Sequence, residues 1–352
     1  MKIFFVGYLT AQYMTSWQRC QTFKELGHEV YGLDQQNYFK VSLTQTIVKR
    51  TIKKFIFDKR EVFTFNQKFL DELVAYKPQI AWIEKSLLLL PETIETARKL
   101  LPNCIFVCFQ EDDPFSPMNA AELPIWKNFI NAIPLYDIHF VWREFNIKEF
   151  IEHGAKNVYL YTHGYYENIF HPIVQKKGDF HHKHDVLFVG TARDQRKSDI
   201  YNLIIQDKIL VSVYGGRWNR TLVYYLKPSL FHPPIFSKDY VEMIWHSKIS
   251  LGYLCAANRD EFTLRTFEIP ACKGFFLAQR TDKHLEIYEE GKEAEFFSSH
   301  DECADKIRFY LKNEDAREKI AKAGYERCIK SGYSLHDRLS KALEQVKLFL
   351  KY

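Results

Sequence analysis

Short apolar segments alternate with longer amphipathic segments along the first half of the chain. The short segments are rich in β-branched and aromatic residues, a pattern typical of buried strands, and the longer ones carry apolar residues at helical spacing. Strands are predicted at residues 2–6, 29–33, 79–84, 104–109, 137–141 and 157–161, with helices at 17–26, 66–76, 91–100 and 143–153. This alternation indicates βαβ units on a parallel sheet, which is a Rossmann-like domain.

The pattern pauses over residues 171–184 and then restarts. Further strands are predicted at 185–190, 209–214, 248–252 and 275–278, with helices at 194–206, 239–246 and 261–271. From about residue 314 the chain reads as helical to its end, and residues 338–350 carry apolar side chains at amphipathic spacing. The expected fold class is therefore α/β, with two Rossmann-like domains at 1–170 and 185–330, a linker at 171–184, and a C-terminal helix at 331–352 that packs back toward the first domain.

Composition narrows the class of protein. The 352 residues suit two domains, and no segment approaches the roughly 20 apolar residues that span a bilayer. Seven cysteines, odd in number and set in apolar contexts, favour reduced thiols in a cytoplasmic protein. The cysteine spacing fits no zinc site, and the cluster of His181, His182 and His184 reads as part of the linker, so no metal site is expected.

The net charge of +5 is mild, but one basic segment stands out around residues 44–60. Lysine and arginine alternate there with isoleucine, valine and phenylalanine, which predicts a basic amphipathic helix. Two interpretations remain open. The segment is either an ordinary surface helix or a patch that meets anionic lipid head groups or an anionic acceptor at the inner face of the cell membrane. A nucleic-acid partner is not expected.

The most informative motif runs from Asp260 to Glu268. Arg265 and Thr266 stand between these two carboxylates at the predicted start of a helix, where free N–H groups and the helix dipole attract a diphosphate. Arg265 would add a bidentate phosphate contact, and Glu268 could accept hydrogen bonds from both hydroxyls of a ribose. The alternative is a capped surface helix, with Asp260 at its start and Arg265 paired to Glu268.

The wider context of this motif resembles a known family. Residues 185–340 resemble CgeB-like glycosyltransferases, a family named from a spore maturation protein. The resemblance rests on Phe188-Val189-Gly190, Val213-Tyr214-Gly215, Leu264 to Ala271, Arg280-Thr281-Asp282 and Ile320 to Tyr325. It implies the GT-B fold, in which two Rossmann-like domains face each other across a cleft, and a nucleotide-activated sugar as substrate. The spacing of Asp260 and Glu268 is similar to the Glu-x7-Glu element of retaining GT-B enzymes, with Asp in place of the first Glu.

Further donor-side candidates follow the other predicted strands, because ligands of open α/β sheets bind beyond the carboxyl ends of strands. They are Gly190, Arg193, Arg196, Tyr214, Gly215 and Ile235. Arg196 could reach the diphosphate, or it is a solvated helix residue. Gly215 allows backbone to approach a ligand closely. Backbone groups of Ile235 could pair with a pyrimidine edge, unless its loop is simply packed in the core.

The first domain offers acceptor-side and catalytic candidates. Gly7, Tyr8 and Thr10 follow the first strand without forming a dinucleotide fingerprint. Asp112 and Asp113 directly follow Glu111 at another strand end, where adjacent acids raise some of each other's pKa values and suit a general base. The alternative there is an Asp-Pro turn. His163 stands at the expected hinge, where it contacts a phosphate or acceptor or is merely packed.

These observations predict a glycosyltransferase that moves a sugar from a nucleotide-diphosphate sugar to an acceptor hydroxyl, in bacterial surface glycan or glycoconjugate synthesis. Retention of the anomeric configuration is favoured by the Asp260–Glu268 spacing. No cofactor or metal is expected, because arginine side chains would neutralise the leaving diphosphate. The acceptor would be a glycan, a lipid-linked molecule or a protein. Two alternatives stay open, a GT-B-fold sugar-nucleotide epimerase and a non-catalytic sugar-nucleotide or glycan-binding protein.

Overall fold

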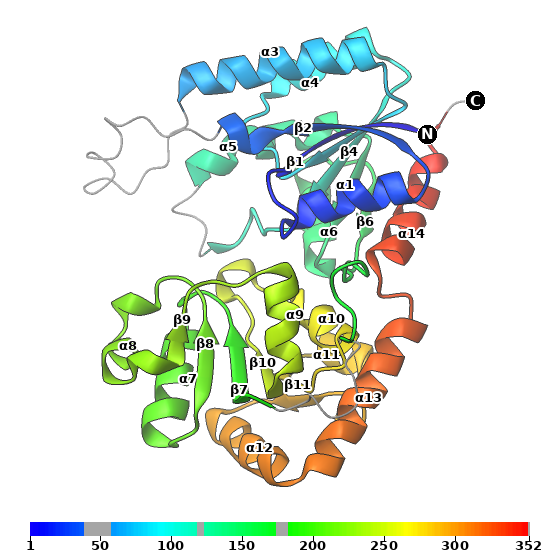
Figure 1. Ribbon diagram of the computed structural model, residues 1–352. Helices are drawn as coiled ribbons and strands as arrows, with labels where there is room; N and C mark the ends of the chain where they lie inside the picture. Colours follow the sequence, from blue (N-terminus) through cyan, green and yellow to red (C-terminus); the bar gives the residue numbers. More distant parts are fainter. Residues whose placement is uncertain (39–57, 118–122, 174–181, 351–352) are drawn as a thin grey trace. The chain divides into compact units, whose positions relative to one another are not determined.

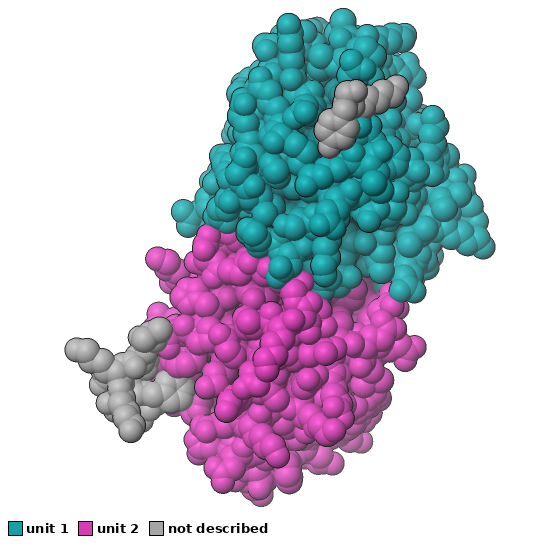
Figure 2. Space-filling view, turned by 90° about the vertical axis from the view of Figure 1, so that its right-hand side faces the viewer, with its two compact units in different colours: residues 1–162, 257–259, 336–352 teal, residues 163–256, 260–335 magenta. Residues whose placement is uncertain are grey.

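The computed structural model describes residues 1–38, 58–117, 123–173 and 182–350 (Figure 1). The chain divides into two compact units, coloured separately in Figure 2. Unit 1 contains Met1–Thr162, Ala257–Arg259 and His336–Tyr352, and unit 2 contains His163–Ala256 and Asp260–Leu335.

Unit 1 is built on a parallel six-stranded sheet in the order β2-β1-β3-β4-β5-β6. The strands are β1 (Lys2–Gly7), β2 (Glu29–Asp34), β3 (Ile80–Glu84), β4 (Ile105–Gln110), β5 (Ile138–Val141) and β6 (Val158–Leu160). The helices are α1 (Thr15–Glu25), α3 (Lys59–Tyr76), α4 (Pro91–Leu100), α5 (Leu123–Ala132), α6 (Glu144–Glu152) and α14 (Leu335–Lys347), with 3-10 turns η1 (Gln35–Tyr38) and η3 (Ile133–Leu135). All six predicted strands are confirmed to within one or two residues.

The central strands of unit 1 are buried along almost their whole length, as expected for a parallel sheet covered by helices on both faces. Trp82 on β3 lies at the centre of an aromatic cluster. Its ring centroid is 5.0 Å from that of Phe23, 5.7 Å from that of Phe109 and 5.4 Å from that of Phe140. This cluster joins α1 to the three neighbouring strands β3, β4 and β5.

Unit 2 contains a second parallel sheet, in the order β12-β11-β10-β7-β8-β9. Its strands are β7 (His184–Val189), β8 (Val211–Tyr214), β9 (Phe231–His232), β10 (Ser247–Gly252), β11 (Phe276–Gln279) and β12 (Glu295–Phe297). Its helices are α7 (Arg196–Tyr201), α8 (Leu222–Leu226), α9 (Ser237–Trp245), α10 (Arg265–Ala271), α11 (Asp282–Ile287), α12 (His300–Lys312) and α13 (Glu314–Lys330). It also contains the short π-helix η4 (Asn202–Gln206) and the 3-10 turns η5 (Trp218–Arg220) and η6 (Pro228–Leu230), whereas most of the 3-10 turn η7 (Ala256–Asn258) belongs to unit 1. The four predicted strands are confirmed, whereas β9 and β12 are too short to leave a periodic signal.

Two helix predictions need correction. The helix expected at 261–271 begins only at Arg265, because residues 260–264 form a loop in which the carbonyl of Glu261 accepts a hydrogen bond from Oγ1 of Thr281. The continuous C-terminal helix is interrupted between α13 and α14. Gly332 there has a φ of 66°, a left-handed conformation that ends a helix.

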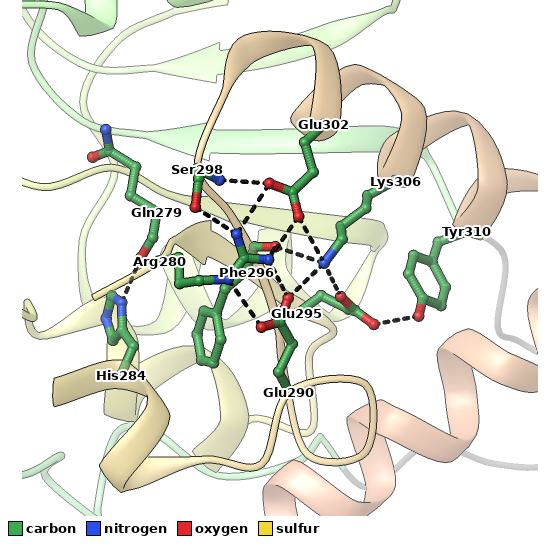
Figure 3. A network of polar contacts seen from close by, with 10 residues as sticks. All are labelled: Gln279, Arg280, His284, Glu290, Glu295, Phe296, Ser298, Glu302, Lys306 and Tyr310. Atoms are coloured by element: carbon green, nitrogen blue, oxygen red, sulfur yellow. Dashed lines mark hydrogen bonds and ion pairs between the residues drawn. The ribbon is translucent and has the colours of Figure 1, made fainter. Parts of the chain in front are cut away.

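A cluster of ionic contacts links β11 and β12 to α12 in unit 2 (Figure 3). Nη2 of Arg280 lies 2.5 Å from Oε1 of Glu290 and 2.6 Å from Oε1 of Glu302. Nζ of Lys306 lies 2.7 Å from Oε1 of Glu290 and 2.6 Å from Oε2 of Glu295. Each cation therefore bridges at least two carboxylates, which holds α12 against the end of the sheet.

No helix in the described ranges is long and apolar enough to cross a membrane.

Candidate functional site

A cavity of about 350 Å³ opens in unit 2 beyond the carboxyl ends of β7, β8 and β10. We call it the strand-end cavity. The described residues that line it are Phe188, Val189, Gly190, Thr191, Arg196, Tyr214, Gly215, Gly216, Pro234, Ile235, Phe236, Leu251, Tyr253, Thr263 and Arg265. Two arginines and no carboxylate occur among them, so the lining favours an anionic ligand.

Glycine is required where the loops after β7 and β8 meet. A Cβ atom on Gly215 would lie 2.0 Å from the carbonyl oxygen of Gly190, so no side chain fits there. The N–H of Gly190 donates to the carbonyl of Tyr214 at 2.9 Å, and Nε1 of Trp218 donates to the carbonyl of Gly190 at 2.8 Å. The two loops thus pack backbone against backbone and form a rigid floor for the cavity.

Both arginines of the cavity contact main-chain carbonyls at or just beyond strand ends, Arg265 through Nη2 at 3.5 Å from the carbonyl of Val189. Nε of Arg196 donates to the carbonyl of Leu254 at 3.2 Å. Burial lowers the pKa of Arg196, and Arg265 lowers it further by repulsion. Burial also disfavours the charge on Arg265, but Tyr240 and Glu268 outweigh it and its pKa is raised. An anionic ligand beside both guanidinium groups would relieve their mutual repulsion.

Glu268 lies on α10 with only 6% of its surface exposed. Its Oε2 atom is buried, receives no hydrogen bond, and lies 3.8 Å from Nη1 of Arg265. Burial raises the pKa of Glu268, although Arg265 opposes the shift. The structure thus contains the Arg265–Glu268 pair of the surface-helix alternative, but on a largely buried carboxylate. Glu268 is not among the residues that line the strand-end cavity.

The start of α10 offers fewer free N–H groups than the sequence suggested. The N–H groups of Thr266, Phe267 and Glu268 already donate to carbonyls of Thr263 and Leu264. The fully buried Thr266 hydroxyl bonds Nε2 of His284 at 2.9 Å and accepts the N–H of Thr263 at 3.2 Å. Thr266 therefore stabilises the turn into α10, and any diphosphate contact here depends mainly on side chains.

The ten donor-side candidates therefore separate into two groups. The cavity brings together Gly190, Arg196, Tyr214, Gly215, Ile235 and Arg265. The four others, Arg193, Asp260, Thr266 and Glu268, lie outside its lining, and Arg193 is exposed. Sequence reasoning missed Thr191, Thr263, Phe236 and Tyr253 as lining residues. Thr191 and Phe236 adjoin selected residues and Tyr253 directly follows β10, so position alone could have indicated these three, whereas Thr263 lies in the loop before α10.

The acceptor-side candidates lie at the end of β1 in unit 1. A Cβ atom on Gly7 would lie 2.8 Å from Cβ of Ser16, so the loop packs tightly on α1. Oγ1 of the exposed Thr10 donates to Oδ2 of Asp34 at 2.7 Å. Burial raises the pKa of Tyr8 to about 12, against the opposing effect of Lys85. Tyr8 is therefore a neutral phenol at physiological pH.

Three acids follow β4, and the structure gives each a cationic partner. Glu111 pairs with Arg19, Asp112 with Lys85, and Asp113 with Arg259. Arg259 belongs to unit 1 by the division of the chain.

These partners change the expected acid–base behaviour. Burial raises the pKa of Glu111, and the neighbouring Asp112 adds a smaller contribution in the same direction. Burial disfavours ionised Asp112 as well, but Lys85 outweighs it and the pKa of Asp112 is lowered. The Asp113 carboxylate is fully buried and also accepts the N–H of Phe115 at 3.1 Å and Nδ2 of Asn146 at 3.2 Å. Asp112 and Asp113 are thus held as paired carboxylates.

His163, the third catalytic candidate, is fully buried at the start of unit 2. Its Nδ1 atom accepts the N–H of Gly164 at 2.7 Å. A Cβ atom on Gly164 would lie 2.5 Å from the carbonyl of Tyr333, so the chain is tightly packed at this point.

Within the described ranges, no group of three or more His, Cys, Asp or Glu side chains is arranged to hold a metal ion. The basic segment predicted at residues 44–60 lies outside the described residues except for its last three. Of these, Asp58 accepts the N–H of Arg60 at 2.8 Å and caps α3.

Comparisons with known proteins agree with this architecture. Residues 197–344 match the model of a family described as glycosyl transferase-like. A comparison with curated protein sequences finds no match.

Solved structures match over nearly the whole chain. Sucrose-phosphate synthase from Thermosynechococcus elongatus matches with a TM-score of 0.67 and 11% identity, over 99% of this chain and 98% of that one. A glycosyltransferase from Rickettsia africae matches with a TM-score of 0.66 and 15% identity, over 99% and 98%. HepE from Anabaena in complex with UDP-glucose matches with a TM-score of 0.65 and 11% identity, over 99% of each chain. The expected GT-B fold is therefore confirmed, whereas the resemblance to CgeB-like proteins stays a prediction.

Proposed function

We propose that this chain is a glycosyltransferase that moves a sugar from a nucleotide-diphosphate sugar to an acceptor hydroxyl. The observation that carries the proposal is the strand-end cavity, whose lining contains Arg196 and Arg265 and no carboxylate. A diphosphate carries negative charge that grows as it leaves the sugar, so two preorganised guanidinium groups stabilise the transition state more than the ground state. The family match over residues 197–344 supports the same reaction class.

Glu268 is the proposed ribose contact. A buried carboxylate oxygen without a hydrogen-bond donor is costly, and the cost is removed when a ligand hydroxyl donates to it. In this proposal the two hydroxyls of a ribose supply those donors, the diphosphate lies against Arg196 and Arg265, and the base lies toward Tyr214 and Ile235. A small rearrangement of side chains would bring Glu268 into contact with a ligand in the cavity, since its ion-pair partner Arg265 lines that cavity.

Retention of the anomeric configuration is part of the proposal. An inverting enzyme needs a general base whose pKa lies near the working pH. Asp112 has a lowered pKa beside Lys85, and Asp113 is buried in a salt bridge with Arg259. Asp112 is therefore not tuned as a base and the Asp113 carboxylate is occupied by Arg259, whereas a retaining reaction strictly requires no protein base. The spacing of Asp260 and Glu268 supports the same stereochemistry.

Because arginines supply the positive charge, we propose that turnover needs no added metal ion. The acceptor is a glycan, a lipid-linked molecule or a protein in a bacterial surface glycan or glycoconjugate pathway, and the enzyme acts in the cytoplasm.

The test is a thermal-shift and calorimetric screen of the full chain against UDP, GDP, ADP, CMP and dTDP sugars. A bound ligand stabilises the folded state by mass action, by about 2.7 kcal/mol at a concentration of 100 Kd. Arg196→Ala and Arg265→Ala should each weaken binding about 10- to 100-fold, the range for a charge-assisted hydrogen bond. Lys197→Ala is the matched control, because Lys197 is an exposed cation beside Arg196 that does not line the cavity.

Absence of binding by every sugar nucleotide would sink the proposal. If the chain binds a sugar nucleotide and converts its sugar to an isomer without any acceptor, it is instead an epimerase. Binding without turnover toward any acceptor, unaffected by Glu268→Gln, would indicate a non-catalytic binding protein. Proton NMR of the first transferred product reports its anomeric configuration and so tests retention.

A further inference from the structure

Helix α8 turns an apolar face outward at the edge of unit 2. Leu222, Tyr225 and Leu226 are 62%, 70% and 48% exposed, while Val223 of the same helix is 1% exposed and packs in the core. A surface helix normally presents polar residues on its outer face. Here apolar side chains three and four positions apart occupy that outer face, so the helix is apolar on both sides.

The charged residues along the chain on either side of this helix are all cations. Between Lys208 and Lys238 the sequence contains no Asp or Glu, and Arg217, Arg220 and Lys227 are all exposed. We define the α8 surface as these three cations together with Leu222, Tyr225 and Leu226. Clustered apolar side chains flanked by cations are the composition of surfaces that bind anionic membranes.

The α8 surface is held rigidly. The hydroxyl of Tyr225 donates to the carbonyl of Asn219 at 3.0 Å, and Oγ1 of Thr221 donates to the carbonyl of Trp218 at 2.7 Å. Trp218 is buried, and its Nε1 atom bonds the carbonyl of Gly190 in the floor of the strand-end cavity. Figure 1 shows α8 at the outer side of β8 and β9, which end the sheet on this side.

We infer that the α8 surface docks onto an anionic lipid bilayer. The arginine and lysine side chains bind lipid phosphates, and the leucines and the tyrosine enter the boundary between head groups and acyl chains. A second copy of the chain fits this face less well, because a two-fold contact through the α8 surface would bring the three cations of each copy together. Nucleic acid would use the cations but leave the leucines exposed.

Co-sedimentation of the full chain with vesicles tests the inference without any nucleotide sugar, so its outcome is independent of the proposed function. The wild-type chain should bind vesicles of phosphatidylcholine with phosphatidylglycerol, should bind phosphatidylcholine alone weakly, and should dissociate at high salt. Arg220→Gln with Lys227→Gln should lower the partition coefficient about 30-fold, at about 1 kcal/mol for each cation. Leu222→Ser with Leu226→Ser should lower it about tenfold.

Phe309→Ser is the matched control, because Phe309 is a 53% exposed aromatic residue on α12, outside the α8 surface. It should bind vesicles as the wild type does, and circular dichroism should show all variants folded. The inference is overturned if the wild type ignores anionic vesicles or if folded α8 variants bind as well as the wild type, since another basic segment would then be responsible. It is also overturned if the wild type forms a concentration-dependent dimer that the leucine variant loses, since the surface would then bind a second copy. Duplex DNA binding that the Arg220→Gln/Lys227→Gln variant loses, without any vesicle binding by the wild type, would overturn it as well.

Discussion

Arg265 and Glu268 form an ion pair across one turn of α10, yet their nearest charged atoms, Nη1 and Oε2, are 3.8 Å apart. That separation is too long for a hydrogen bond, and no described residue donates a hydrogen bond to Oε2. The carboxylate end of the pair is therefore poorly satisfied, whereas Arg265 also contacts the carbonyl of Val189 and the ring of Tyr240. Buried polar groups that lack a hydrogen-bond partner often occur at functional sites, where a ligand can supply the missing hydrogen bond.

We predict that Glu268→Gln separates stability from binding. Burial raises the pKa of Glu268, so its folded state favours the neutral form, and the associated stability is lost as the pH rises through the folded pKa. The neutral amide removes the cost of burying the Glu268 charge and should raise the free energy of unfolding at pH 7, by about 1 kcal/mol at most, because the loss of the charge opposite Arg265 offsets part of the gain. The same variant should lose the Tm increase produced by a nucleotide sugar. A lower Tm without ligand would contradict this interpretation.

Gly215 and Gly216 provide a second test, because they are adjacent but differ in their surroundings. Gly215→Ala places Cβ 2.0 Å from the Gly190 carbonyl, so the two loops must separate. We expect a loss of about 2–3 kcal/mol in unfolding free energy and a loss of donor binding. Gly216→Ala meets no heavy atom within 4 Å and should change the unfolding free energy little, although Gly216 also lines the cavity. Chemical denaturation and calorimetry measure them, and equal effects of the two substitutions would count against a backbone contact as the cause.

Much of the strand-end cavity could be predicted because strand ends are readable from sequence. The apolar runs that end near Val189 and Tyr214 place the following glycines at one edge of a parallel sheet, and Gly190 and Gly215 do meet there. It is harder to predict which side chains near the start of a short helix point toward the cavity. Arg193 and Arg196 lie three positions apart near the start of α7, but only Arg196 lines the cavity. The loop before α7 decides this, and its conformation includes a φ of 45° at Asp194 that no periodicity indicates.

The acid group after β4 illustrates a different limit. The pKa of Glu111 is raised mainly by burial and less by its neighbour Asp112, and the cations that pair with Asp112 and Asp113 come from distant segments. Lys85 follows another strand, and Arg259 is far along the chain. A single sequence gives the charges that are neighbours along the chain, whereas a pKa depends on those that are neighbours in space.

The cluster around Arg280 should make unit 2 sensitive to acid (Figure 3). The Arg280 guanidinium lowers the pKa of Glu302 to about 2 through hydrogen bonding, and it also lowers the pKa of Glu290. These depressed values mean that the stabilisation is complete above the ordinary glutamate pKa of 4.5 and is lost as the pH falls toward 2.

Glu302→Gln should therefore reduce the unfolding free energy at pH 7 by about 1–2 kcal/mol and by much less near pH 2. We keep the figure small because Glu302 is 31% exposed and solvent screens its contacts. Denaturant unfolding across this pH range measures the effect. Glu286→Gln is the control, since Glu286 is 62% exposed and pairs only with Lys283 among the contacts described, and it should change little. A constant difference between wild type and Glu302→Gln at all pH values would argue against charge as the cause.

Asp112→Asn should leave turnover within about tenfold of the wild type if the reaction proceeds with retention. Removing a true general base costs about 10²- to 10⁴-fold. Asp112 is a poor base because Lys85 outweighs burial and lowers its pKa, so the carboxylate is ionised throughout the neutral range and gains little from taking a proton. The neutral amide keeps the shape of the side chain and its contact with Nδ2 of Asn258, which an amide oxygen can still accept at 3.2 Å. Steady-state kinetics with the donor identified by the binding screen, taken from pH 5 to 9, measure kcat and kcat/KM for both forms. A loss of a hundredfold or more in kcat, together with loss of the acidic limb of the pH profile, would assign Asp112 as the base and would favour inversion.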